Sequence, residues 1–497
     1  MDSQAEQRLM QAMYDRIYDM LTYSPGPGRG PIFSKQTTLL QLATMGAGLN
    51  PANFANAVSP AHPTGDLLSS ENFSRLVDPV PAIGALYNTT TVNVESTYGQ
   101  MINGANVTTD PVPAQVAKYE QAFKYLNTTT EITAFDGTKT TQTGPSQILQ
   151  TYQTNQLAYQ TAVSNFRLAF LSYDMSKPSD QQKWQAQAGV LQAAMDQAYN
   201  NWRNQGAAQV EQAQNVLATT INDGARSVIA DAQRIYAQST MAGQFQGDTS
   251  WHLSYGMPSN WGDPNPITVK KLFAHYDIST SNLNTSSSSD FTSYGGGAGF
   301  SLGLFSIGGS YDHSTSHQRF HMDATDIHVS MDICVVQIVR PWLNGLVFNT
   351  SHWYNNAFNR GGISTGNLLD HVTTPMKLIP TAFVVARNIV ISGNFSQSDM
   401  SRFTQHDSAG GSFGWGPFQI GGHYSRDKSG QTFSSTVVPG KVTVPGMQII
   451  AWVSQIVPFC PPNDAPGNHF NVVVHDVAHP FMHAVDLAEE LEPVLTS

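Results

Sequence analysis

Ser412 lies within the sequence GGSFG (410–414), which matches a pattern that supports covalent catalysis in other proteins. The pattern Gly-x-Ser-x-Gly holds the nucleophilic serine of many hydrolases on a sharp strand-to-helix turn, with a histidine downstream. No helical periodicity follows Ser412, and the similar stretch earlier in the chain has Gly299 at the matching place. Because so short a pattern is weak without its structural context, we predict no serine nucleophile.

Two sets of histidines recur at every fourth position, a spacing that can bind a metal on one face of a helix. The sets are His313, His317 and His321, and His475, His479 and His483. Pro480 interrupts the second set, and no carboxylate or thiolate pattern completes either one. We therefore predict surface or hydrogen-bonded histidines, no metal, no cofactor and no enzyme activity. A pH-sensing role stays open, since histidine changes charge between about pH 5 and 8.

The stretches that contain these residues belong to an internal duplication. GFSLGLFSIGGSY (299–311) corresponds to SFGWGPFQIGGHY (412–424), so that Phe300, Phe305 and Tyr311 match Phe413, Phe418 and Tyr424 at a constant spacing. Farther out, VQIVRPW (336–342) parallels SQIVPF (454–459). Since Ser412 and the His313–His321 series are not shared by the two copies, the duplication indicates a shared geometry and no shared chemistry.

The periodicity of apolar residues indicates which elements position the duplicated stretches. Spacings of three and four over 146–240 predict two or three long antiparallel helices, whereas alternation from about 267 to 461 predicts strands. We predict an α+β fold in which a helical hairpin or bundle precedes an internally duplicated antiparallel β domain, sandwich-like or barrel-like. The predicted regions are an irregular, partly helical N-terminal region (1–140), a helical hairpin or bundle (141–245), a first β unit (262–343), a connector (344–380), a second β unit (381–461), and a C-terminal strand and helix (462–497).

The glycine-rich hairpins permit two interpretations. In one, the two copies form the halves of a bent sandwich or barrel, and their aromatic residues face inward. In the other, the hairpin tips are exposed apolar points that contact a membrane or a partner subunit. The candidate contact residues at the tips are Leu302, Leu304, Phe305, Trp415, Pro417 and Phe418. Gly416-Pro417 predicts a tight turn or bulge between the strands of the second hairpin.

The composition restricts the class of partner. Only 12% of the residues are charged and the formal net charge is −11, so a phosphate backbone has no cluster of lysine and arginine to bind. The N-terminal residues lack the apolar core of a signal peptide, and we expect a protein made without a cleavable signal that stays in the cytoplasm or leaves by another route. Cys334 and Cys460 could form a disulfide, but two small core residues are the favoured interpretation.

Three functions are compatible with these features. The first is a non-enzymatic membrane-active or pore-forming protein of toxin type, which would use amphipathic helices and the twin hairpins. The second is a self-assembling structural protein, a subunit of a filament, sheath or shell, whose low surface charge permits contact between copies. The third is a carbohydrate-binding module with Trp342, Trp353, Trp415 or Tyr424 as stacking platforms. The expected partners are therefore a membrane or further copies of the chain, with carbohydrate as an alternative and no nucleic acid.

Overall fold

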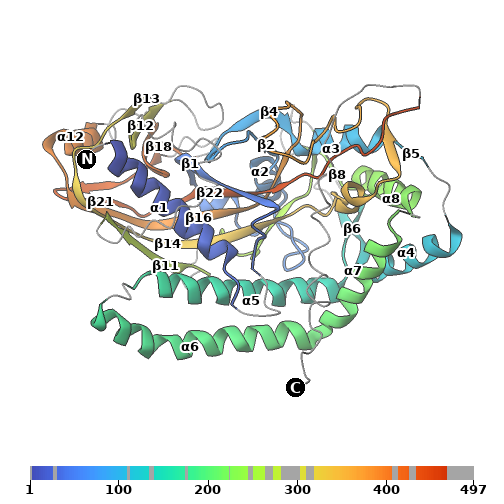
Figure 1. Cartoon of the computed structure of the whole chain (residues 1–497), viewed down its shortest axis with the longest axis horizontal. Coiled ribbons are helices and arrows are strands. Elements are labelled where there is room, and N and C mark those ends of the chain that lie inside the picture. Colours follow the sequence, from blue (N-terminus) through green and yellow to red (C-terminus); the bar gives the residue numbers. More distant parts are fainter. Residues whose placement is uncertain are drawn as a thin grey trace, which may run out of the picture.

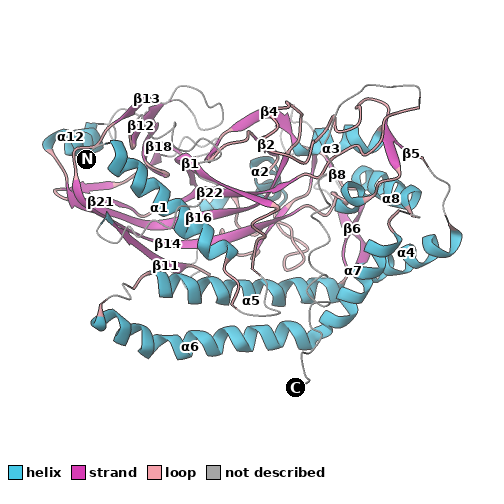
Figure 2. Ribbon diagram, viewed as in Figure 1, coloured by secondary structure: helices cyan, strands magenta, loops and turns pink. Residues whose placement is uncertain are grey.

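The computed structural model has the α+β architecture predicted from the sequence (Figures 1 and 2). It describes residues 3–25, 31–108, 112–133, 139–173, 177–222, 224–243, 250–263, 272–280, 303–308, 318–405, 412–424 and 432–466. The strand and helix expected within 462–497 lie largely outside these ranges, as do Leu302 and most of the two histidine series.

A nine-stranded sheet forms the centre of the molecule, and both copies of the duplicated unit contribute to it (Figure 1). Its main path runs β10-β14-β16-β22-β1-β3, with β11 paired to β14, and β21 and β20 continuing from β16. The strands are β1 (Thr38–Leu49), β3 (Leu86–Tyr87), β10 (Tyr255–Met257), β11 (Ala274–Ser279), β14 (Thr325–Val339), β16 (Leu378–Asn394), β20 (Thr436–Val438), β21 (Lys441–Val444) and β22 (Met447–Ile456). Antiparallel pairing of β14 from the first copy with β16 from the second joins the two copies edge to edge.

The sheet is buried on both faces, and β14 shows how one strand serves two cores. In its first half the residues Ile327, Val329, Met331 and Ile333 face one hydrophobic cluster. From Cys334 onward the alternate residues, Val336 and Ile338 among them, face another cluster on the opposite side. Strict alternation of side chains along a strand allows this change without any break in pairing.

A smaller five-stranded sheet packs against the large one and contains the glycine-rich hairpins. Its order is β13-β12-β17-β18-β19, in which β12 and β17 pair the two copies directly. The strands are β12 (Phe305–Gly308), β13 (Gln318–Phe320), β17 (Ser412–Trp415), β18 (Phe418–His423) and β19 (Thr432–Phe433). The two sheets meet closely at β1, where a Cβ atom on Gly46 would lie 2.9 Å from the Pro417 carbonyl oxygen and 3.0 Å from the Gln419 backbone nitrogen of the second hairpin. Glycine is therefore required there by close packing.

Helix α1 (Ser3–Thr22) lies across the face of the large sheet beside the small sheet (Figure 1). Its buried apolar stripe consists of Leu9, Met10, Met13, Tyr14, Ile17, Met20 and Leu21. Glu6, fully buried near the N-terminal end of the helix, accepts a hydrogen bond of 2.6 Å from the Met322 backbone N–H. Its other oxygen lies 2.6 Å from His321 Nδ1, so α1 is fastened to the segment after β13 by a buried carboxylate.

The remaining helices form a hairpin beside the sheet and a cluster at one end of it (Figure 2), except for the helices at 67–76 and 397–405, which pack against the large and the small sheet. They are α2 (Leu67–Leu76), α3 (Val94–Asn103), α4 (Pro113–Leu126), α5 (Gln147–Leu171), α6 (Pro178–Trp202), α7 (Ala208–Thr220), α8 (Ala225–Gln238) and α12 (Gln397–Gln405). The end cluster contains α3, α4, α7 and α8 around a core of their own. Short paired strands complete the chain: β2 (Pro79–Pro81) with β4 (Thr89–Asn93), β5 (Ala105–Val107) with β15 (Trp353–Asn355), β6 (Asn127–Thr133) with β7 (Lys139–Pro145), and β8 (Thr240–Met241) with β9 (Trp251–His252).

The N-terminal region is more ordered than the sequence suggested. We expected an irregular, partly helical region over 1–140, but β1 lies inside the large sheet between β22 and β3. Cys334 and Cys460 are both free and buried in different clusters, in agreement with the expectation of two core residues.

The Glu6 contact predicts a stability effect. Replacing Glu6 by alanine leaves the buried N–H of Met322 without an acceptor, so we expect a loss of about 1–3 kcal/mol in the free energy of unfolding. Glutamine at this position retains an acceptor and should lose less. Chemical unfolding of the two variants measures the difference. Equal stability of Glu6→Ala and the unaltered protein would show that this contact does not hold α1 in place.

Candidate membrane and partner interface

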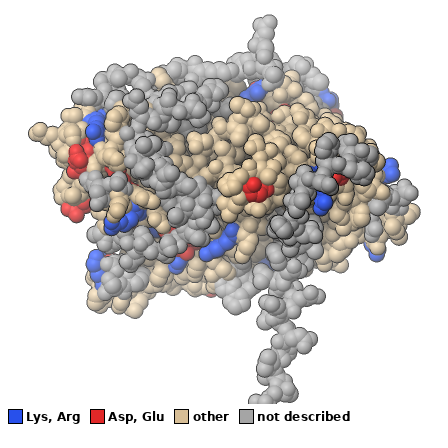
Figure 3. Space-filling view, turned by 45° about the horizontal axis from the view of Figure 1, so that its top comes forward, with Lys and Arg blue, Asp and Glu red and all other residues tan. Residues whose placement is uncertain are grey.

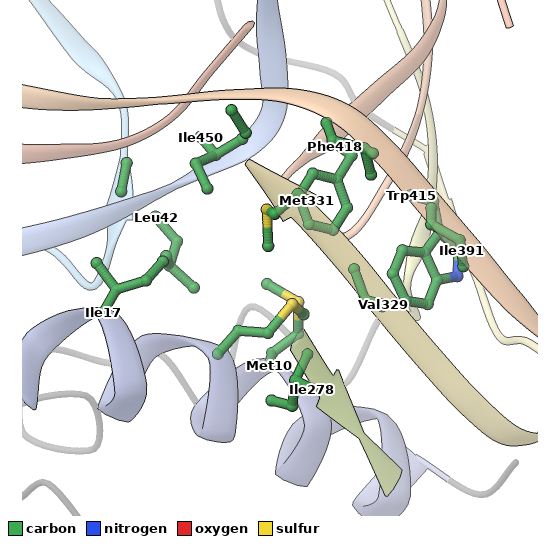
Figure 4. Close-up of a cluster of buried hydrophobic side chains, with 14 of the residues drawn as sticks. Met10, Ile17, Leu42, Ile278, Val329, Met331, Ile391, Trp415, Phe418 and Ile450 are labelled. Carbon is green, nitrogen blue, oxygen red and sulfur yellow. The ribbon is translucent and has the colours of Figure 1, made fainter. Parts of the chain in front are cut away.

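The hairpin tips that were candidates for membrane or partner contact are core residues in this fold. Phe305, Trp415 and Phe418 are each 0% exposed, and Leu304 and Pro417 are buried as well. Figure 4 shows Trp415 and Phe418 among side chains of α1, β14 and β16. This arrangement corrects the expectation that these five residues form exposed tips, while Leu302 lies outside the described residues.

The local geometry explains why the second tip is buried. The turn expected at Gly416-Pro417 is present between β17 and β18, and Gly416 has a φ of +56° that favours glycine. A Cβ atom at Gly416 would lie 3.0 Å from Met10 Sδ of α1. The apolar turn is therefore covered by α1, and the interpretation with inward-facing aromatic residues describes this structure.

The residues considered for chemistry are not assembled into a site within the described ranges. Ser412 begins β17 opposite Gly308, and a turn and another strand follow it where a hydrolase would need a helix. His321 is engaged with Glu6. A search of the described part of the chain finds no group of three or more potential metal ligands. His313, His317, His475, His479 and His483 lie outside the described residues.

The aromatic side chains considered as carbohydrate platforms are equally inaccessible. Trp342, Trp353 and Trp415 are fully buried. Tyr424 is partly buried and packs edge-on against Phe433, with their ring centroids 5.4 Å apart. A sugar ring needs an open aromatic face for stacking, and none of these four residues presents one in this fold.

The burial of the tips predicts the result of replacing them. Trp415→Ser and Phe418→Ser should each reduce the free energy of unfolding by at least about 3 kcal/mol, because each leaves a cavity and places a hydroxyl in an apolar core. Val190→Ser is a suitable control, since Val190 is 72% exposed and should tolerate the change. A Trp415→Ser protein with the thermal midpoint of the control would contradict the core assignment.

The most exposed regular element is the helical hairpin of α5 and α6. Figure 1 shows α5 lying between the large sheet and α6, so that α6 is the outer helix. Its outward side chains come mostly from Gln, Ala, Gly, Val and Asn, and Asp196 is the only charged residue between Trp184 and Trp202. Charged groups are also sparse on the face drawn in Figure 3. A helix of 25 residues on the outside of a protein that carries only three charged residues, Asp180, Lys183 and Asp196, is a candidate contact surface.

The inner face of α6 is rich in aromatic residues that pack on α5. Trp184 lies edge-on to Phe166, with ring centroids 5.2 Å apart. Near the other end Trp202 stacks on Tyr159 at 5.6 Å, and Tyr199 meets the same tyrosine at 5.3 Å. These contacts place the aromatic stripe of α6 in the seam of the hairpin.

The passage from α6 to α7 contains a kink. Gln205 and Gly206 have non-helical dihedral angles, and Gly206 has a φ of +86°. An ion pair between Arg203 and Glu211 spans this point, with Arg203 Nη2 3.0 Å from Glu211 Oε2. Because the helical hydrogen-bond pattern is interrupted here, α6 can change its angle to α7 at lower cost than at an unbroken helix.

Helix α5 is attached to the body by polar contacts. Arg167 donates to Asp19 of α1 at 2.8 Å, and Arg16 Nη1 donates to the Leu171 carbonyl at 3.0 Å. Gln337 of β14 donates to Gln160 Oε1 at 2.5 Å. The hairpin therefore has a tethered inner helix and an outer helix that packs mainly on its partner.

Comparisons with known proteins give no further guide, because no family model, curated protein or solved structure matches this chain. Within the described ranges, none of the helices combines the length and apolar character needed to cross a bilayer.

Proposed function

We propose that this chain is a non-enzymatic, membrane-active protein of the pore-forming, toxin type, and that α6 is its first bilayer-contacting element. The observation that supports this proposal is the aromatic stripe of α6, which is sheltered by α5 while the outer face of the helix is open and carries few charges. Trp and Tyr side chains favour the interface between lipid and water.

The geometry suggests how contact would begin. Rotation of α6 about Gln205 and Gly206 would open the seam and present Trp184, Tyr199 and Trp202 on one side of the helix. Transfer of these rings from α5 to the lipid interface keeps them out of water, so the apolar burial of each side chain, about 1.5–3 kcal/mol, is largely preserved.

The twin hairpins have a later role in this proposal. Their apolar turns lie under α1, so they can reach a bilayer only after α1 has moved away. Amphipathic hairpins of this kind are the elements that β-barrel pores refold and pair. The hairpin of α5 and α6, which needs no such displacement, therefore acts first.

Leakage from dye-loaded liposomes tests this proposal. Cysteines replace Tyr159 and Tyr199, whose ring centroids are 5.3 Å apart, and a bifunctional thiol reagent joins them across the seam. We expect the joined protein to lose at least about 90% of its leakage activity, since α6 can no longer leave α5. The same variant treated with a monofunctional reagent is the control, and Cys334 and Cys460 are buried and remain protected.

Two outcomes of this assay count against the proposal. One is the absence of binding and leakage with the unaltered protein at both about pH 5 and about pH 7.5, the range in which histidine titrates. The other is full leakage by the joined protein, which would assign membrane contact to a different element.

The outer face of α6 supports a second candidate, self-assembly into a structural polymer. Val190 is 72% exposed, and no atom lies within 4 Å of the Cβ position of Gly189. In a chain of net charge −11, a surface with few charges is where two copies can meet with little electrostatic repulsion. Small residues also allow two helices to approach closely.

Light scattering and negative-stain microscopy without lipid test this second candidate. Val190→Glu would bring like charges together in a symmetric contact and should shift the protein towards monomers. Val438→Glu is a matched control, because Val438 is also exposed but lies on β20. A monomeric unaltered protein at all concentrations would exclude self-assembly through this face.

A further inference from the structure

Four ionisable side chains lie near one another where the end cluster of helices joins the large sheet. Asp78 precedes β2, Glu95 lies in α3, His252 ends β9, and Arg340 follows β14. The Glu95 backbone N–H donates to Asp78 Oδ1 at 2.8 Å, and Glu95 Oε1 lies 2.8 Å from His252 Nδ1. His252 is 4% exposed, and Asp78, Glu95 and Arg340 are half-buried.

The surroundings of the group link separate parts of the fold. His252 stacks on Tyr236 of α8 with ring centroids 4.0 Å apart, and its Nε2 lies 2.9 Å from the Tyr236 carbonyl oxygen. The Tyr236 hydroxyl donates to the Glu95 carbonyl at 3.1 Å. The guanidinium of Arg340 donates to the carbonyls of Val77 and Pro380 at 2.5 Å each. The same contacts thus connect α3, α8, β9 and two strands of the large sheet.

The balance of charge in this group depends on the proton of Asp78. Burial, followed by the negative charge of Glu95, raises the pKa of Asp78 from 3.8 to about 6, although the Glu95 N–H, Arg340 and His252 oppose the rise. Burial lowers the pKa of Arg340 to about 10, so it stays positive near neutrality, with Tyr87 and Asp78 beside it. Burial raises the pKa of Tyr236 to about 12, which keeps that hydroxyl neutral.

We propose that Asp78, Glu95, His252 and Arg340 form a proton-responsive clamp, which fastens α3 and α8 to the end of the large sheet more tightly in mildly acidic than in alkaline solution. The carboxylates of Asp78 and Glu95 outnumber the single guanidinium of Arg340, which leaves negative charge in excess at a partly buried site. Uptake of one proton by Asp78 removes that excess. Neutralisation removes the cost of burying the excess charge.

The direction of the pH effect follows from Asp78. Its pKa is higher in the folded protein than in the unfolded chain, so the folded state binds this proton more tightly. The stabilisation is complete below about pH 4 and is lost as the pH rises through about 6. The interval between 3.8 and about 6 corresponds to about a 100-fold change in the folding equilibrium constant. This inference is independent of the proposed membrane activity.

Replacing Asp78 by asparagine tests the clamp, because asparagine imitates the protonated acid and still offers an oxygen to the Glu95 N–H. Unfolding is measured at about pH 5.5 and about pH 8, on either side of the Asp78 pKa. We expect Asp78→Asn to raise the folding equilibrium constant by up to about 100-fold at the higher pH and by far less at the lower. Hydrogen exchange of α8 amides, corrected for intrinsic rates, should lose its dependence on pH in this variant.

Asp370→Asn is a matched control, because the pKa of Asp370 is shifted in the opposite direction to that of Asp78. Partial burial raises the pKa of Asp370, but hydrogen bonds from Lys377, Thr365 and the Val372 N–H outweigh it and hold that pKa below its usual value. This substitution should therefore destabilise the protein at the higher pH.

The clamp is refuted if Asp78→Asn leaves the pH dependence of α8 exchange unchanged. Should that variant fail to fold, carboxyl NMR of the unaltered protein decides: a midpoint near 6 for Asp78 supports the clamp, and one near 4 refutes it.

Discussion

The antiparallel pairing of β14 with β16 is the interaction on which the rest of the structure depends. It joins a strand of the first copy to a strand of the second, from Thr325 opposite Asn394 to Gln337 opposite Ala382. The resulting sheet has apolar residues on both faces, and each face packs into a separate hydrophobic core. Helix α1 and the small sheet cover one face, while α2 and Trp261 cover the other.

The two copies are similar in sequence but not equivalent in the fold. Phe433 of β19 pairs with Gly422, whereas its counterpart Phe320 of β13 pairs with Phe305, although Gly309 is the residue that matches Gly422. The segment after β13 is also fastened by two buried carboxylates, Glu6 of α1 and Asp399 of α12. The duplication therefore supplies two similar hairpins, and their neighbours give them different surroundings.

The low content of charged residues is the second feature that shapes the fold. Aromatic residues pack between elements, as they do between α5 and α6. Some of the chain's charged residues connect separate elements, as in the group around Asp78 and the contact of Arg167 with Asp19. Separation of α6 from α5 requires the opening of an aromatic seam, whereas separation of α5 from α1 requires a change in a charged contact.

The sequence by itself determined the class of fold, the helical hairpin, the duplication and the turn at Gly416-Pro417, because periodicity and turn residues are local signals. It also indicated correctly that Cys334 and Cys460 are core residues. It did not reveal β1, whose pattern TLLQLATMGAGL is apolar on both faces and shows no alternation. Nor did it bring Asp78, Glu95, His252 and Arg340 together, since they are far apart in the chain. Only the tertiary structure decided which way the hairpin tips point: an apolar tip has the same sequence whether a membrane or α1 covers it, and here α1 does.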